Sequence, residues 1–287
     1  MVIKDILEKA VIELKNAGVD APVMEAGALL CYVLKKDKSY IYSHRDYNLS
    51  DFLTNEFFEL IEQRKKRKPY QYITGQQEFM SLNFMVNPNV LIPRQETEIL
   101  VETLIQYCRT KGKVDILDIG TGSGCIAVSL AYYIKECSVT AIDISDEALN
   151  VAKFNAITNG VKEKINFLVC DILQETNLSA GASYDIVVSN PPYIVTDEIP
   201  KLQKEVREYE PRIALDGGED GLLFYRKITE KASEVLKPGG LLAFEIGYNQ
   251  GKDVSKIMEV KFSDIKVIKD LSGNDRVVTG YLKLLLK

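Results

Sequence analysis

The chain has 287 residues, of which 46% are hydrophobic and 27% are charged. These proportions are typical of a folded globular protein of one large or two unequal domains, and they exclude a disordered or fibrous chain. With 36 basic and 41 acidic side chains the net charge is -5, which argues against broad, non-specific binding to nucleic acid. The only histidine, His44, leaves no basis for a Ser-His-Asp hydrolase or a histidine-rich metal site.

The spacing of the cysteines and the length of the apolar runs indicate in which cellular compartment the protein is expected. The five cysteines contain no Cys-x-x-Cys pair, so reduced thiols are favoured over a disulfide framework and we expect no metal site. The first residues enter a helical pattern without signal-peptide features, and no apolar run approaches the roughly 18 residues of a membrane span. These features predict a cytoplasmic protein that does not associate with membranes.

Residues 1–75 are predicted to form a helical domain. Apolar residues recur at intervals of three and four from Ile3 to Leu14, Pro22 marks the start of a second helix, and Ser50 is placed to cap a third. The third helix ends in the basic run 64–68, Arg-Lys-Lys-Arg-Lys. We interpret this basic run as a solvated helix end near the negative pole of its dipole, with contact to an RNA-associated partner as the alternative.

Residues 76–95 are predicted to form a hairpin linker. The run 79–86 alternates like a strand, and Asn87-Pro88-Asn89 has the composition of a turn. A helix is expected to follow from about Gln95 to Arg109.

Strand and helix patterns alternate through residues 96–287. Apolar strands separated by helix-length segments indicate a parallel sheet covered on both faces, and the short connection 270–275 favours an antiparallel final pair. We therefore predict an α/β fold with a doubly wound, mostly parallel seven-stranded sheet. The predicted strands are 114–119, 138–142, 164–169, 184–189, 241–246, 264–268 and 276–282.

A glycine-rich segment, Gly120-Thr121-Gly122-Ser123-Gly124, follows the first strand of the predicted sheet. Glycines at this place let the backbone turn sharply and approach a ligand at the start of a helix, so we interpret it as a ligand-binding loop rather than a plain turn. The pattern Gly122-x-Gly124-x-x-Ala127 also satisfies a permissive dinucleotide fingerprint, which keeps an NAD-dependent oxidoreductase open.

Two acidic residues stand at the ends of later strands. Asp143 lies 23 residues past Gly120, where a carboxylate can accept hydrogen bonds from both ribose hydroxyls of an adenosine, and a helix-capping role is the alternative. Asp171 is placed to meet an adenine amino group, with Ile172 beside it to cover the ring, and a polar loop start is the alternative. NAD and S-adenosylmethionine both contain adenosine, so these residues do not separate the two.

The segment Asn190-Pro191-Pro192-Tyr193 directly follows the strand 184–189. Two prolines after a buried strand make the chain stop and turn rigidly, and a residue before proline is biased to extended backbone. The Asn190 side-chain oxygen and the Pro191 carbonyl can therefore both point outward, as fixed acceptors for the two hydrogens of an NH2 group. The Tyr193 ring can stack on that group. This pattern favours chemistry on a planar nitrogen over a plain turn.

Together these motifs resemble S-adenosylmethionine-dependent methyltransferases that act on a planar nitrogen of adenine, guanine or glutamine. The flanking sequence is similar to the peptide chain release factor glutamine methyltransferase family, with one departure at Ile172, where some members carry an aromatic residue. The segments that carry this similarity are Pro69-Tyr70-Gln71-Tyr72-Ile73-Thr74-Gly75, Leu91-Ile92-Pro93-Arg94, Glu96-Thr97-Glu98, Glu210-Pro211-x-x-Ala214-Leu215, Gly217-Gly218-x-Asp220-Gly221 and Asp270-Leu271-x-Gly273-x-Asp275-Arg276.

The resemblance implies methyl transfer from S-adenosylmethionine, which becomes S-adenosylhomocysteine, to the side-chain amide nitrogen (N5) of the glutamine in a release factor's Gly-Gly-Gln segment. It implies that Asn190, Pro191, Pro192 and Tyr193 are catalytic and that they bind this glutamine together with Arg94. The implied cofactor residues are Gly120, Thr121, Gly122, Ser123, Gly124, Asp143, Asp171, Ile172, Asn190 and Thr97. The helical domain is expected to bind the release factor, and indirect ribosome association is left open.

Three alternatives remain from the sequence. A nucleic-acid exocyclic-amine methyltransferase is supported by the basic run and opposed by the acidic composition. An NAD-dependent oxidoreductase would need nicotinamide-side residues that the motifs do not supply. A catalytically silent binding protein is opposed by the intact Asn-Pro-Pro-Tyr segment.

Overall fold

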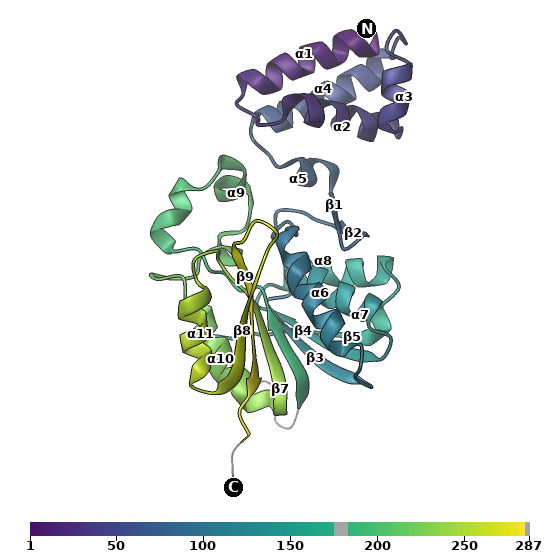
Figure 1. Ribbon diagram of the computed structural model, residues 1–287. Coiled ribbons are helices and arrows are strands. Elements are labelled where there is room, and N and C mark those ends of the chain that lie inside the picture. The colour runs from purple at the N-terminus through teal and green to yellow at the C-terminus, as the bar shows by residue number, and fades with distance from the viewer. Residues whose placement is uncertain (175–182, 285–287) are drawn as a thin grey trace. The chain divides into compact units, whose positions relative to one another are not determined.

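Figure 1 shows the computed structural model, which describes residues 1–174 and 183–284. The chain forms two compact units. Unit 1 comprises Met1–Gln76 together with Gln203–Tyr209, and unit 2 comprises Gln77–Leu202 together with Glu210–Lys287. No sequence motif predicted that a segment more than a hundred residues downstream belongs with the N-terminal helices.

Unit 1 is built from helices around one apolar core. Pro22 occupies the first turn of its helix, and the Ser50 hydroxyl accepts a hydrogen bond from the Leu53 amide at 3.4 Å, which confirms both predicted helix starts. The core contains Ile3, Ile6, Leu14, Phe57 and Ile61, whose spacing follows the helical periodicity. The helices are α1 (Ile3–Asn16), α2 (Pro22–Leu34), α3 (Lys38–Ser43), α4 (Asp51–Lys65), α5 (Tyr70–Thr74) and α9 (Lys204–Tyr209).

Most cations of the basic run are paired within unit 1. Arg64 is only 5% exposed, pairs with Glu25, and donates to Glu205 Oε1 at 3.0 Å. Arg67 donates to the two oxygens of Glu205 at 2.6 and 2.7 Å, and these bonds outweigh burial and lower the pKa of that carboxyl. The interpretation as a solvated helix end is therefore wrong for both arginines, although Lys66 is exposed.

We expect Glu205→Ala to destabilise unit 1 by about 2 kcal/mol, because two part-buried guanidinium groups lose a shared acceptor. Glu208→Ala on the same helix is the matched control, since Glu208 is exposed and its ion pairs are long, at 3.6 and 3.7 Å. Urea unfolding of the whole protein measures both variants. Equal free energies of unfolding would show that the Glu205 pairs contribute nothing net.

The predicted hairpin exists, but its turn lies within the run that the sequence suggested was one strand. β1 (Gln76–Phe79) pairs with β2 (Leu82–Met85), and Met80 and Ser81 between them have φ values of 51° and 58°. Neither residue is a glycine or asparagine, so the usual signal of such a turn is missing. The turn is held from outside, because the Tyr133 hydroxyl donates to the Met80 carbonyl at 2.6 Å.

Unit 2 contains a seven-stranded sheet with the order β5-β4-β3-β6-β7-β9-β8, in which only the pairs made by β9 are antiparallel. This confirms the predicted doubly wound, mostly parallel sheet. The strands are β3 (Val114–Ile119), β4 (Cys137–Asp143), β5 (Ile165–Val169), β6 (Tyr184–Ser189), β7 (Leu236–Glu245), β8 (Phe262–Lys269) and β9 (Asp275–Leu282).

Helices cover both faces of this sheet and bury one apolar cluster on each side. In Figure 1, α6, α7 and α8 lie on one side of the sheet and α10 and α11 on the other. Neighbouring residues of β3 point to opposite clusters, Ile116 to the first and Leu117 to the second, as the strand period of two requires. These helices are α6 (Glu96–Cys108), α7 (Cys125–Tyr133), α8 (Asp146–Thr158), α10 (Leu223–Val235) and α11 (Gly251–Glu259).

The start of β7 differs from the sequence interpretation. The predicted strand 241–246 begins earlier in the structure, because the segment Lys237-Pro238-Gly239-Gly240 is an irregular part of β7, with a register shift opposite β6 and φ of 74° at Gly239. Short 3-10 segments complete unit 2 at Lys162–Lys164, Thr196–Lys201 and Arg212–Ala214. In the described part of the chain, no helix is long and apolar enough to cross a bilayer.

Candidate active site

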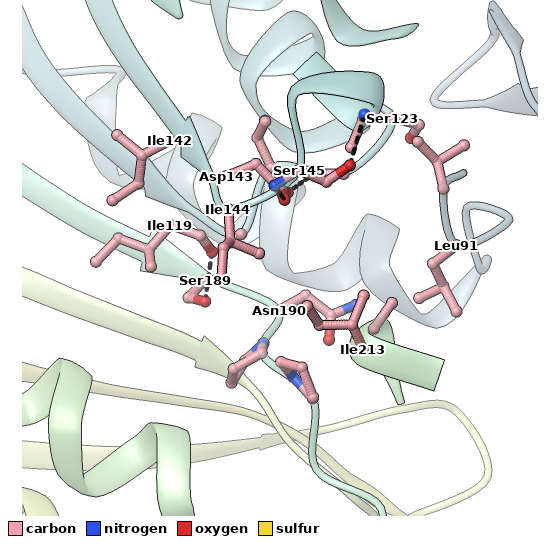
Figure 2. Close-up of a pocket in the computed structure, with 18 of the residues that line it drawn as sticks. Leu91, Ile119, Ser123, Ile142, Asp143, Ile144, Ser145, Ser189, Asn190 and Ile213 are labelled. Atoms are coloured by element: carbon pink, nitrogen blue, oxygen red, sulfur yellow. Dashed lines mark hydrogen bonds between the residues drawn. The ribbon is translucent and has the colours of Figure 1, made fainter. Parts of the chain in front are cut away.

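A pocket lies at the carboxyl ends of β3, β4, β5 and β6, which is where open α/β sheets bind ligands. Figure 2 shows its side chains converging from the ends of different strands and from the loops that cover them. The Ser189 hydroxyl donates to the Ile119 carbonyl at 2.6 Å, so the ends of β6 and β3 are tied together directly beneath the pocket.

The pocket brings together nearly all the site residues predicted from the sequence. The predicted residues that line it are Arg94, Thr97, Gly120, Thr121, Gly122, Ser123, Asp143, Asp171, Ile172, Asn190, Pro191 and Pro192. Gly124 and Tyr193 are not among its lining residues.

The three glycines of the loop after β3 have different surroundings although all have positive φ, at 71°, 55° and 80°. A Cβ on Gly120 or Gly122 would meet no atom within 4 Å, so the backbone there leaves free space. A Cβ on Gly124 would lie 2.9 Å from the Cβ of Ala152 on α8. Gly124 is therefore needed for close packing against a helix, while Gly120 and Gly122 face open volume.

Asp143 at the end of β4 connects the glycine loop to the chain that enters α8. One carboxylate oxygen accepts from the Gly122 amide at 2.8 Å and the other from the Ser145 amide at 3.0 Å. Burial raises the pKa of Asp143, and these backbone amides oppose that rise. The cap of α8 is Ser145, which accepts from the Ala148 amide at 3.1 Å, so the capping role considered for Asp143 belongs to its neighbour.

Asp118 is a buried acid in this region that the sequence interpretation did not single out. It precedes the glycine loop by two residues and is fully buried, and Thr121 donates to its Oδ2 at 2.6 Å. Burial raises the pKa of Asp118 to about 7. Its position just before the loop is the only sequence signal that could have identified it.

Asn155 on α8 was also missed, although it holds the glycine loop in place. Its amide donates to the Ser123 carbonyl at 2.9 Å and to the Met85 carbonyl at 3.0 Å, and its oxygen accepts from the Met85 amide at 2.7 Å. The residue is fully buried and fully paired, so one side chain fixes β2 and the pocket loop against the same helix.

The Asn-Pro-Pro-Tyr segment is held from behind by polar groups. The Asn190 amide donates to Thr97 Oγ1 at 3.3 Å, and Thr97 on α6 is 2% exposed. The Tyr193 ring packs against the second apolar cluster, where burial raises its pKa. The backbone carbonyl of Tyr193 accepts a hydrogen bond from Gln250 Nε2 at 3.1 Å. Stacking of Tyr193 on a bound amide stays a prediction.

Close backbone contact explains the glycines of the segment 217–221. A Cβ on Gly217 would lie 2.7 Å from the Tyr193 Cα, and a Cβ on Gly221 would lie 2.5 Å from the backbone carbonyl oxygen of Tyr193. Side chains at these two positions would displace the chain that follows Asn190, so the glycines are a packing requirement of the site.

Arg94 is anchored to a buried acid on the loop that covers the pocket. It donates to Glu210 Oε1 at 2.5 Å, and the Glu210 side chain is only 1% exposed. Burial raises the pKa of Glu210, and Arg94 opposes that rise. Arg94, Pro211 and Ile213 all line the pocket, so this ion pair joins two chain segments that form one wall of the pocket.

No group of three His, Cys, Asp or Glu side chains that could hold a metal ion occurs in residues 1–174 and 183–284.

Solved structures similar to this chain support the fold assignment. A methyltransferase from Pyrococcus furiosus is 18% identical, with a TM-score of 0.51 over 72% of this chain and 91% of the other. The 16S rRNA N2 G1207 methyltransferase of T. Thermophilus, solved with AdoMet and guanosine, is also 18% identical, with a TM-score of 0.52 over 72% of this chain and 50% of the other. At this identity the likeness concerns the fold alone.

Sequence families narrow the assignment. Residues 5–75 match the family model described as PrmC N-terminal domain, and residues 110–272 match that of a methyltransferase domain. A release factor glutamine methyltransferase from Clostridium acetobutylicum is 44% identical over 97% of this chain and 98% of its own. One from Clostridium botulinum is 41% identical over the same shares. The chain thus belongs to the release factor glutamine methyltransferase family, as its motifs predicted.

Proposed function

We propose that this protein transfers a methyl group from S-adenosylmethionine to the side-chain amide nitrogen (N5) of the glutamine in the Gly-Gly-Gln segment of peptide chain release factors, with S-adenosylhomocysteine as the second product. The observation that carries the proposal is the position of Asn190, Pro191 and Pro192 in one pocket with the glycine loop. The family membership of the chain supports the same reaction.

The residues of the pocket fit the adenosine part of this cofactor. The free space beside Gly120 and Gly122 lets a ligand approach the backbone closely. The Asp143 carboxylate accepts two backbone hydrogen bonds, which leaves lone pairs for ribose hydroxyls because a carboxylate has about four acceptor sites. Asp171 and Ile172 line the part of the pocket after β5, where we place the adenine. The bound cofactor supplies an electrophilic methyl group on a sulfonium.

The chemical difficulty is that the lone pair of an amide nitrogen is delocalised into the carbonyl. We infer that the Asn190 side-chain oxygen and the Pro191 carbonyl accept the two amide hydrogens of the substrate glutamine. Fixed acceptors stabilise the positive charge that develops on nitrogen and aim its lone pair at the methyl group. The methylated nitrogen then loses a proton readily, so no strong base is needed before transfer.

We assign supporting roles to the remaining predicted residues. Thr97 and Arg94 shape the pocket between cofactor and glutamine, and Tyr193 stacks on the glutamine amide once the substrate is bound. We propose that the helical region 1–75 binds the body of the release factor, and that the protein acts in the cytoplasm, where these substrates and ribosomes are found.

The alternative of a nucleic-acid amine methyltransferase loses its main support in the structure. The basic run was the feature that favoured it, and Arg64 and Arg67 are engaged with glutamates of unit 1. An RNA-associated partner would have to compete with these ion pairs for the two arginines.

Methyl transfer from labelled S-adenosylmethionine to unmethylated release factor tests the proposal directly. We expect label on the release factor, and none on a variant whose Gly-Gly-Gln glutamine is replaced by alanine. Duplex DNA in a parallel reaction serves as the competing substrate. Label on DNA alone, or label that survives the glutamine replacement, would contradict the proposed substrate.

A further inference from the structure

A buried glutamate lies directly behind Asn190. In the parallel pair of β6 and β7, Ser189 is opposite Phe244, so the next residues lie side by side: Asn190, directly after β6, and Glu245, the last residue of β7. Glu245 is 3% exposed and does not line the pocket. Its carboxylate therefore acts on the pocket only through the residues it touches.

Glu245 lies next to two polar side chains, those of Thr97 and Asn190. The Thr97 hydroxyl and the Asn190 amide both lower the pKa of the Glu245 carboxyl, as hydrogen-bonding groups beside a carboxylate do. The Asn190 amide nitrogen donates to Thr97 Oγ1 at 3.3 Å, so the NH2 end of the amide is on the side of Thr97. The second carboxylate oxygen, Oε2, is buried and has no hydrogen-bond partner among the described residues.

These side chains determine which end of the Asn190 amide can face the pocket. A carboxylate only accepts hydrogen bonds, so the NH2 end of Asn190 must be the end that faces Glu245. Because the amide is planar, its oxygen then points away from Glu245, and Asn190 lines the pocket. Without the carboxylate either orientation could form, and the reversed one would present a donor to the NH2 group of a substrate.

We propose that Glu245 is a positioning residue, which holds the Asn190 amide with its oxygen toward the substrate nitrogen. This inference rests on the proposed methylation of an amide NH2 group and adds to it the device that orients the acceptor. Thr97 supports the same orientation as the second acceptor for the Asn190 amide.

The Glu245 carboxyl is expected to change its protonation state near neutral pH. Burial, with a smaller contribution from the charge of Glu96 on α6, raises the pKa of Glu245 to about 7, and Thr97, Arg276 on β9 and Asn190 oppose that rise. A protonated carboxyl has one acceptor fewer for the hydrogens of Asn190, so the turnover rate should fall as the pH drops through about 7. The other titratable groups that interact electrostatically with Glu245 are Tyr193, Tyr225 and Cys125.

A double-mutant cycle separates positioning from a merely structural role. We expect Glu245→Gln to lower kcat about 10-fold or more, since misplacing one contact has effects of this scale, and to leave the affinity for S-adenosylmethionine within about 2-fold. In an Asn190→Ala background the same change should cost nothing further, because Glu245 acts through Asn190. Glu102→Gln, which removes an exposed carboxylate farther along α6, is the matched control and should keep wild-type kcat.

Two results of this cycle would overturn the inference. One is a wild-type rate for Glu245→Gln, and the other is a further loss when the change is made in the Asn190→Ala background. Thermal unfolding of each variant identifies a loss caused by misfolding. Glu245→Ala is the second variant, and it should lower kcat at least as much as Glu245→Gln.

A measurement without release factor tests the contact itself. The side-chain NH2 signals of Asn190 in a 15N–1H spectrum, identified by their loss in Asn190→Ala, should shift between pH 6 and 8 in the wild-type protein and stay constant in Glu245→Gln. Asn190 signals that are the same in the wild-type protein and in Glu245→Gln throughout this pH range would refute the inference. If the signals titrate but the wild-type protein does not methylate release factor, the proposed substrate fails and the Glu245 contact stands.

Discussion

Replacing Asn190 by alanine is expected to lower kcat about 100-fold or more, the scale of losing one preorganised polar contact to developing charge. The variant loses the side-chain acceptor for one substrate hydrogen, while the Pro191 carbonyl remains. The fold should persist, because Ser189 and the prolines that fix the turn are untouched. Single-turnover rates with S-adenosylmethionine and release factor measure the effect, and the affinity for the cofactor should change much less.

The matched control is Asn150→Ala, which removes an exposed asparagine of α8 that makes only a 3.4 Å contact with Asp146. Its turnover should equal that of the wild-type protein. Near-normal turnover of Asn190→Ala itself would remove this residue from the mechanism, and the Pro191 carbonyl would be left as the sole acceptor.

Replacing Asp143 by alanine is expected to weaken the binding of S-adenosylmethionine by about 1.5–3 kcal/mol, which is roughly a 10- to 150-fold rise in Kd. Two effects combine. The ribose hydroxyls lose a charged acceptor, and the amides of Gly122 and Ser145 lose the carboxylate that holds the glycine loop in place. Isothermal titration calorimetry with the cofactor measures the change.

Asp143→Asn tests how much of the loss in cofactor affinity comes from the charge of the carboxylate, and Asp146→Ala is the matched control. The asparagine keeps a side-chain acceptor without the charge, so its Kd should lie between those of the wild type and Asp143→Ala. Asp146 is exposed in the first turn of α8, and its removal should leave the Kd unchanged. An unchanged Kd for Asp143→Ala would mean that Asp143 serves only the local backbone.

The sheet could be predicted from the sequence because its central strands are buried on both faces. The predicted strands 114–119 and 184–189 coincide with β3 and β6, since mainly apolar runs followed by glycine or proline admit few alternatives. The pocket followed from the same pattern, because ligand-binding residues at the carboxyl ends of neighbouring parallel strands must come together.

The features that were not predicted from the sequence depend on contacts with residues far away along the chain. The turn at Met80 and Ser81 has positive φ without a glycine or asparagine, and it relies on contacts such as that from Tyr133. Asn155 and Glu245 are single polar residues within apolar surroundings, and a sequence alone does not show which buried atoms they pair with. The pairing of Arg64 with Glu205 joins residues 141 positions apart, which helix periodicity cannot reveal.

The division of the chain into two units has a consequence for recombination and protein engineering. The chain passes from one unit to the other three times, after Gln76, Leu202 and Tyr209. A fragment that begins at Gln77 would keep α9 but leave Glu205 without its arginine partners, and a fragment that ends at Gln76 would lack α9. No single crossover can therefore exchange unit 1 between relatives as an intact cassette, and a working chimera requires both of its pieces from the same parent.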